Sequence, residues 1–197
     1  MLTLLYLAAS YLAGSLSAAI IVCRVLGKGD PRTVGSGNPG ATNVLRAYGK
    51  GPAAATLAGD VLKGFLPVMI GAGLGFSPAI IAAVGVAAFL GHLLPLFFSF
   101  KGGKGVATLI GVMFGYDWRL GCGFAVSWLV VAAWSRYSSL AALCAAALSP
   151  VLALGLQLPL PYACALVVMV AAVFWRHRVN IQRLRAGTEG RIGTRRA

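Results

Sequence analysis

The chain has 197 residues, of which 59% are hydrophobic and 11% are charged, whereas a typical soluble domain has about 25% charged residues. The formal net charge is +13, which in a soluble protein would suggest a nucleic-acid partner. Here the basic residues cluster in short polar segments between apolar runs, as membrane topology requires. The composition therefore argues against nucleic-acid binding and predicts one membrane-embedded domain over residues 1–197.

Seven apolar runs are candidate transmembrane helices, which predicts an all-α integral membrane protein with about seven spans. A bilayer core of about 30 Å needs roughly 20 helical residues to cross it. In chain order the runs are 2–22, 52–76, 78–100, 106–116, 120–135, 140–158 and 159–175. The fourth run is short, so its helix must be tilted, extended or packed where the bilayer is thin. A five-span alternative holds if residues 106–135 do not cross.

The basic residues predict the orientation. If the N-terminus lies outside, the polar segments 24–50 and 101–104, Arg136 and the tail from Arg176 all lie inside. Arg119 is then the one basic residue outside, and Lys63 lies within the second run. Because inside loops are rich in Lys and Arg, we expect a multi-pass membrane protein with a cytoplasmic C-terminus.

The first polar motif covers residues 35–46 and combines glycines with hydrogen-bonding side chains. Glycine lets the backbone adopt positive φ and approach a ligand closely, and an arginine fork suits phosphate. An ordinary loop followed by a helix cap would explain one Ser or Asn, but less easily the whole set. We therefore take the polar side chains as candidate substrate-binding residues: Ser36, Asn38, Thr42, Asn43 and Arg46.

The second motif, residues 101–108, is a glycine-lysine run that leads into the fourth apolar run. Successive N–H groups in a Gly-rich turn form an anion site, and the N-terminus of the following helix favours the same anion. A loop that only obeys the positive-inside rule is the alternative, and it suffices for Lys101 taken alone. For the run as a whole we favour phosphate binding by Lys101, Gly102, Gly103, Lys104, Gly105 and Thr108.

The third motif follows the last apolar run. If that helix continues, His177, Asn180 and Arg183 lie along one face and can complete a site near the membrane surface. A solvated basic tail is an equally good interpretation of this spacing.

Ionisable residues also occur inside the apolar runs. Asp60 and Lys63 are three residues apart and can form an ion pair on one helix face. Intramembrane charges usually face the protein interior, so Lys63 either belongs to a structural pair or lines the site. A lone histidine such as His92 is more often a hydrogen-bonded structural residue than a catalyst.

Some chemistries are disfavoured by residue content. The four acidic residues suggest neither a carboxylate pair for acid–base catalysis nor a metal cluster, so we expect no metal and no cofactor. The four cysteines all fall in apolar runs without a Cys-x-x-Cys pair, and we expect them to be small core residues. A His-x-x-x-x-Asp pattern, used by thioester-dependent glycerol phosphate acyltransferases, is absent.

The three motifs together resemble the PlsY family of bacterial acyl-phosphate:glycerol-3-phosphate acyltransferases. The similarity extends in order from Gly14-Ser15 to Gly187-Thr188-Glu189. The final arginine-rich residues are particular to this chain and do not follow the family pattern. It implies transfer of a fatty acyl group from acyl phosphate to the 1-hydroxyl of sn-glycerol 3-phosphate, giving 1-acyl-sn-glycerol 3-phosphate (lysophosphatidic acid) and phosphate. This is the first acylation of bacterial phospholipid synthesis, so the resemblance also implies a multi-pass protein of the bacterial cytoplasmic (inner) membrane.

The resemblance also implies roles. Ser36, Lys104 and His177 are candidate catalytic residues, while Lys63 and His92 join the three motifs as candidate phosphate- or substrate-binding residues. The general base stays open among Ser36, His177, His92 and a substrate phosphate oxygen, and we favour substrate assistance. We expect a monomer in membrane lipid. An anion transporter is less consistent with the sequence, because it would show inverted repeats and interrupted helices at mid-membrane, whereas the motifs cluster at one face. An anionic-lipid scaffold could use the arginines of the tail but would not need the Ser, Asn and Thr side chains of the first motif.

Overall fold

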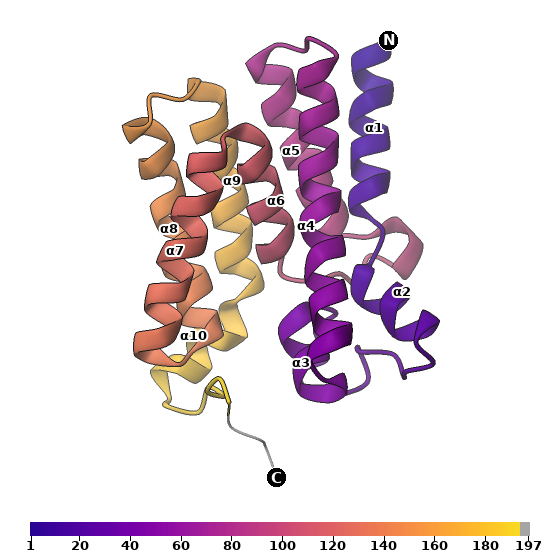
Figure 1. The fold of residues 1–197 in the computed structure, drawn as a ribbon, viewed down its shortest axis with the longest axis vertical. Helices are drawn as coiled ribbons and strands as arrows, with labels where there is room; N and C mark the ends of the chain where they lie inside the picture. Colours follow the sequence, from indigo (N-terminus) through magenta and orange to yellow (C-terminus); the bar gives the residue numbers. More distant parts are fainter. Residues whose placement is uncertain (194–197) are drawn as a thin grey trace.

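The computed structural model describes residues 1–193, and every regular element in that range is a helix (Figure 1). In chain order the elements are α1 (Leu2–Gly14), α2 (Ala18–Val25), α3 (Ala41–Tyr48), α4 (Lys50–Gly73), α5 (Pro78–Leu93), a 3-10 turn η1 (Leu96–Phe98), α6 (Val106–Tyr116), α7 (Trp118–Ser135), α8 (Ser138–Gly155), α9 (Leu160–Arg176) and α10 (Arg178–Arg185). The N-terminus lies at one end of the bundle, and α3 and α10 lie near the opposite end (Figure 1).

Three helical segments within residues 1–193 are long and apolar enough to cross a membrane, namely Lys50–Gly73, Pro78–Phe98 and Ser138–Gly155. The number rises to five if α1 with α2, and α9 with α10, each count as one bent span. Helix α6 is apolar but shorter. The all-helical architecture is confirmed, whereas seven spans and the orientation of the termini stay predictions.

One expected run is broken, and the chain changes direction just after the last one. The first breaks after Gly14, and α2 leaves α1 at 49°. The last does not continue as one straight helix, because α10 leaves α9 at 59° with His177 at the junction. The condition for His177, Asn180 and Arg183 to share one helix face, a continuous last helix, is therefore not met, and His177 joins two helices of different direction.

The third expected run also ends early. Helix α5 stops at Leu93, two residues before Pro95, because the proline ring disfavours helical geometry in the residue before it. Ser99 and Phe100 then adopt positive φ angles of 54° and 58°. These turns separate the second motif from α5 and bring it to the start of α6.

Glycines allow α6 to lie deep in the bundle. A Cβ atom on Gly64 of α4 would collide with the backbone oxygen of Thr108, and one on Gly111 of α6 would collide with that of Val61. Small residues let membrane helices approach closely. Leu109, Val112 and Met113 of α6 are fully buried, so packing against protein offers a physical reason why so short a helix is tolerated.

The cysteine prediction holds for one residue out of four. Cys23 is buried, whereas Cys122, Cys144 and Cys164 are exposed on the outside of the bundle. A bilayer is as apolar as a protein core, so an apolar run does not reveal which of its residues face inward.

Candidate active site

The glycine loop, defined as Gly102–Gly105, leads into α6 and presents backbone N–H groups. Gly105 caps the helix with a φ of 85°, and a Cβ there would collide with the ring of Phe89. Within residues 1–193 nothing accepts a hydrogen bond from the N–H groups of residues 104–108. Unsatisfied N–H groups at a helix N-terminus form an anion site, so this loop is built to bind a negatively charged group.

Lys104 is the centre of a polar chain that joins three distant parts of the sequence. Its ammonium donates to Asn180 Oδ1 at 2.5 Å, and Asn180 Nδ2 donates to Glu189 Oε1 at 2.7 Å. The Ser139 hydroxyl donates to the same oxygen at 2.7 Å. Burial lowers the pKa of Lys104 to about 8, against an opposing effect of the Glu189 charge. Lys104 is thus a cation that can titrate near neutral pH.

Two residues at the end of α9 flank this chain. His177 is 3% exposed, and its Nδ1 lies 2.8 Å from the Val173 carbonyl oxygen. Because a carbonyl can only accept, Nδ1 carries the hydrogen and Nε2 of a neutral ring is left as an acceptor. Arg176 donates to the carbonyl oxygens of Gly103 at 3.0 Å and Gly102 at 2.5 Å. Arg176 therefore contacts the glycine loop directly.

In the first motif, Asn43 is a buried scaffold. Its Oδ1 accepts the N–H of Ser36 at 2.9 Å, and its Nδ2 donates to the carbonyls of Pro31 and Val34 at 2.8 and 3.1 Å. These bonds use the polar atoms of Asn43 to shape the turn that carries the exposed Ser36. Asn38 is half-buried beside it.

The remaining residues of the first motif reach across to other elements. Arg46 of α3 donates to the Gly190 carbonyl at 3.3 Å, next to Glu189. Thr42 lies 3.5 Å from the Ser138 hydroxyl at the start of α8. The first motif and the C-terminal segment therefore meet in space, as one shared site requires.

The other expected site residues differ in their surroundings. Lys101 and Arg183 are exposed, and the Arg183 charge lowers the pKa of Lys104. Thr108 is fully buried, and its hydroxyl has no hydrogen-bond partner within residues 1–193.

Lys63 and His92 belong to a separate buried cluster. The ammonium of Lys63 lies 2.8 Å from the Asp60 carboxylate and donates to the Leu16 carbonyl at 2.7 Å, at the break between α1 and α2. His92 Nδ1 lies 3.5 Å from the same carboxylate. The predicted Asp60–Lys63 pair is confirmed. The cluster reaches the glycine loop through His92, whose carbonyl accepts the Gly103 N–H at 3.2 Å.

Three residues that the sequence did not single out join the site: Arg176, Ser139 and Glu189. In the sequence, Arg176 cannot be distinguished from any other basic residue at the inside end of a span. Glu189 had one available signal, since it is one of only four acidic residues in the chain and lies in the Gly187-Thr188-Glu189 segment. Nothing local to Ser139 distinguishes it.

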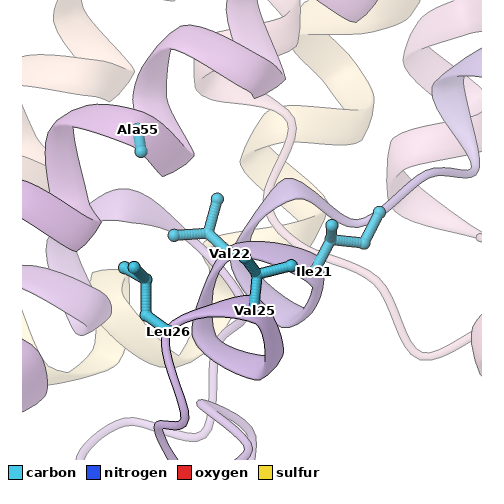
Figure 2. Close-up of a pocket in the computed structure, with 5 residues that line it drawn as sticks. All are labelled: Ile21, Val22, Val25, Leu26 and Ala55. Atoms are coloured by element: carbon cyan, nitrogen blue, oxygen red, sulfur yellow. The ribbon is translucent and has the colours of Figure 1, made fainter.

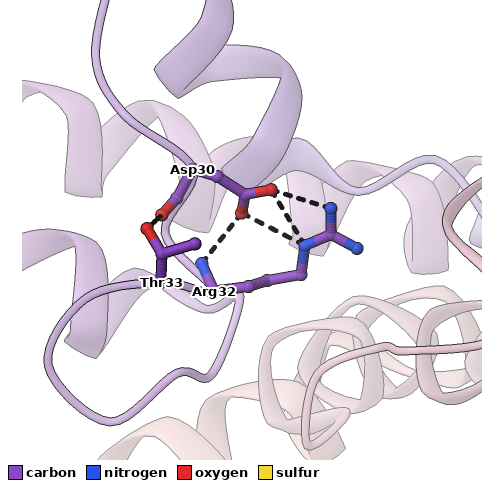
Figure 3. Close-up of polar contacts among 3 residues, drawn as sticks. All are labelled: Asp30, Arg32 and Thr33. Carbon is purple, nitrogen blue, oxygen red and sulfur yellow. Dashed lines mark hydrogen bonds and ion pairs between the residues drawn. The ribbon is translucent and has the colours of Figure 1, made fainter.

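Two other features are poor candidates for a phosphate site. An open recess between α2 and α4 is lined by aliphatic residues alone: Ile21, Val22, Val25, Leu26 and Ala55 (Figure 2). It can hold hydrocarbon but has no group for a phosphate. The Asp30 carboxylate binds the Arg32 guanidinium at 2.7 Å, and Thr33 donates to the Asp30 carbonyl at 2.9 Å (Figure 3). The Arg32 bonds hold the pKa of Asp30 below its usual range, so this turn satisfies its own charges.

In the described range no three His, Cys, Asp or Glu side chains are grouped to hold a metal ion. The polar groups converge instead on the anion site formed by the glycine loop, Lys104 and Asn180. Apolar helices around such a site define a helical membrane protein with an anion-binding end.

Comparisons with known proteins give the family. The chain matches the glycerol-3-phosphate acyltransferase family model over residues 4–187 and belongs to that family. It is 53% identical over 186 residues to a glycerol-3-phosphate acyltransferase of Thioalkalivibrio sulfidiphilus, covering 94% of this chain and 92% of that one. It is 50% identical over 194 residues to a glycerol-3-phosphate acyltransferase of Halorhodospira halophila, covering 98% of both chains.

Solved structures agree with these relatives. The chain superposes with a TM-score of 0.93 and 38% identity on PlsY, an integral membrane glycerol 3-phosphate acyltransferase, in its glycerol 3-phosphate form, covering 98% of this chain and 97% of that one. The lysophosphatidic acid form of PlsY gives a TM-score of 0.92 at 36% identity, with the same coverage. The family resemblance is thereby confirmed, and the chain is a membrane-embedded member of it.

Proposed function

We propose that this chain transfers a fatty acyl group from acyl phosphate to the 1-hydroxyl of sn-glycerol 3-phosphate, as the first acylation of phospholipid synthesis at the bacterial inner membrane. One observation carries the proposal: the N–H groups of residues 104–108 have no acceptor among the described residues, and the same stretch of chain carries the half-buried Lys104. Both substrates carry phosphate, which this site suits in charge and hydrogen bonding. The neighbouring apolar helix surfaces suit the acyl chain.

The reaction needs no external co-reactant. The hydroxyl oxygen of glycerol 3-phosphate bonds to the acyl carbonyl carbon, and the bond from that carbon to the phosphate oxygen breaks. The hydroxyl proton ends on the released phosphate. An acyl phosphate is already activated, so the enzyme contributes mainly by positioning the two substrates. Lys104 and the loop N–H groups stabilise the developing oxyanion and the leaving phosphate.

The proton can leave without a protein carboxylate as base. His92 is engaged with Asp60 and Gly103 in the buried cluster, which favours a supporting role for it. His177 Nε2 and the Ser36 hydroxyl remain candidate bases, and a phosphate oxygen of a substrate is the base that we favour.

The site divides into two proposed halves. The glycine loop with Lys104 and Thr108 holds one phosphate, and Asn43 shapes the turn opposite. The residues assigned to the second phosphate and the glycerol hydroxyls are Ser36, Asn38, Thr42, Arg46, His177, Asn180 and Arg183.

Purified protein incubated with an acyl phosphate tests the proposal. Phosphate release and lysophosphatidic acid formation should both require glycerol 3-phosphate. With acyl-CoA as the donor, in preparations free of acyl phosphate, no product should form. Comparable turnover with acyl-CoA contradicts the assignment of acyl phosphate as the donor. Phosphate release that does not depend on glycerol 3-phosphate contradicts the assignment of glycerol 3-phosphate as the acceptor.

A further inference from the structure

Arg176 holds two successive carbonyl groups of the glycine loop with one guanidinium. Its Nε donates to the Gly103 oxygen and its terminal nitrogen to the Gly102 oxygen, across more than 70 positions of sequence. The planar fork of arginine suits such two-point binding. Both carbonyls must therefore point toward the end of α9.

The planarity of the peptide bond fixes what these two bonds do to the loop N–H groups. In a trans peptide the C=O and the following N–H point in opposite directions. The Gly102 carbonyl faces Arg176, and the Gly103 N–H accordingly points the other way and donates to His92 O at 3.2 Å. Both polar groups of this peptide are used, so it anchors the loop between α5 and α9.

The next peptide is held on one side only. The Gly103 carbonyl faces Arg176, so the Lys104 N–H points away from that guanidinium. No residue in the described range accepts this N–H. Gly103 cannot carry a Cβ, which would collide with the His92 ring, and a glycine turns more readily than other residues. Without Arg176, no hydrogen bond from a described residue would hold this peptide with its N–H directed at the anion site.

We propose that Arg176 is a positioning residue: it locks the peptide between Gly103 and Lys104 so that the Lys104 N–H is aimed at a bound phosphate group. This inference rests on the proposed phosphate-binding function of the loop. Arg176 acts through the backbone that it orients. The N–H groups that it directs at the loop are used by the Gly102 and Gly103 carbonyls.

Three variants test this role: Arg176→Ala, Arg176→Lys and the control Arg178→Ala. Arg178 carries the same charge two positions away, is exposed, and donates only to the Trp175 carbonyl within the described range. We expect kcat/KM to fall about 10²-fold in Arg176→Ala, the low end for loss of an oriented donor. Arg176→Lys should lose about 10-fold because an ammonium lacks the fork, and Arg178→Ala should stay within about 3-fold, as expected for an exposed charge.

The folded state is checked by size-exclusion chromatography and thermal unfolding, and rates are expressed per folded molecule. A purely structural role would lower the amount of folded protein and leave those rates unchanged, which would overturn the inference. Full activity in Arg176→Lys would also overturn it, because charge alone would then suffice. If Arg176→Ala does not fold, Arg176→Lys decides the question by the same measurements.

Inorganic phosphate separates this inference from the proposed function. Phosphate should raise the thermal unfolding temperature of wild-type protein and of Arg178→Ala, and raise it much less in Arg176→Ala and Arg176→Lys. This binding test does not require turnover. A wild-type protein that binds phosphate but transfers no acyl group contradicts the proposed function alone. Equal phosphate stabilisation in wild type and both Arg176 variants contradicts the positioning role.

Discussion

The ammonium of Lys104 and the side-chain oxygen of Asn180 lie 2.5 Å apart, although 76 positions separate them in sequence. This contact joins the glycine loop before α6 to the first turn of α10. Residues 104–108, the stretch that begins with Lys104, also have N–H groups that no described residue accepts. The second and third motifs therefore meet in space.

Replacing Lys104 with alanine should lower kcat by about 10²–10³-fold, the usual loss when a preorganised electrostatic group is removed. The protein should still fold and insert, because the many other basic residues of the same segments maintain the orientation. Lys101→Ala is the control, since Lys101 carries the same charge but is exposed outside the glycine loop. Near-wild-type turnover of Lys104→Ala at saturating substrate would remove Lys104 from the catalytic machinery.

Activity should fall as pH rises through about 8. Burial lowers the pKa of Lys104 to about 8 in the substrate-free protein, so the cation is present below that pH and is lost above it. The profile of kcat/KM against pH reports the free enzyme and should show this alkaline limb. In the Lys104→Arg variant the limb should move to much higher pH, because arginine stays protonated. An unchanged limb in that variant would assign the titration to another group.

Asn43 should matter for the shape of the first motif more than for direct binding. Asn43→Ala removes the partner of the Ser36 N–H and of two carbonyls, and leaving buried polar groups unpaired costs about 1–3 kcal/mol. Thermal unfolding should occur at lower temperature, and proteolysis after the neighbouring Arg32 should be faster. Asn38→Ala is the stability control, since no described residue forms a hydrogen bond with the Asn38 side chain. Equal stability of the two variants would contradict the scaffold role.

The predicted orientation can be tested with single cysteines in a variant that lacks the four native ones. Lys50→Cys, Lys101→Cys and Arg195→Cys should resist an impermeant thiol reagent in intact cells, because the basic bias places them inside. Residue 195 lies outside the described range, so its test rests on the charge pattern alone. Labelling of any of the three from outside would show that the orientation is wrong.

Arg119→Cys distinguishes seven spans from five. It lies at the start of α7, next to the junction with α6. With seven spans this junction is outside and the cysteine should react with the reagent. If residues 106–135 do not cross the membrane, it stays inside and should not react until the cells are opened.

The helical class and the three motifs could be predicted from sequence because hydropathy and residue spacing are local properties. Run 106–116 coincides with α6, and the pairing of Asp60 with Lys63 follows from their separation along one helix. By contrast, the break after Gly14 and the early end of α5 were missed, because long apolar runs hide breaks that packing and turn geometry introduce.

Apolar length and local composition are enough to establish a helical membrane protein with glycine-rich, basic motifs. The packing of the helices was needed to show that Asn43 holds the turn of the first motif by hydrogen bonds. It also showed that Arg176 donates to two carbonyls of the glycine loop. It was also needed to connect Ser139 and Glu189 to Lys104 through Asn180. Most of these contacts join residues tens of positions apart in the chain. They depend on how the helices pack against one another, which no local pattern of residues encodes.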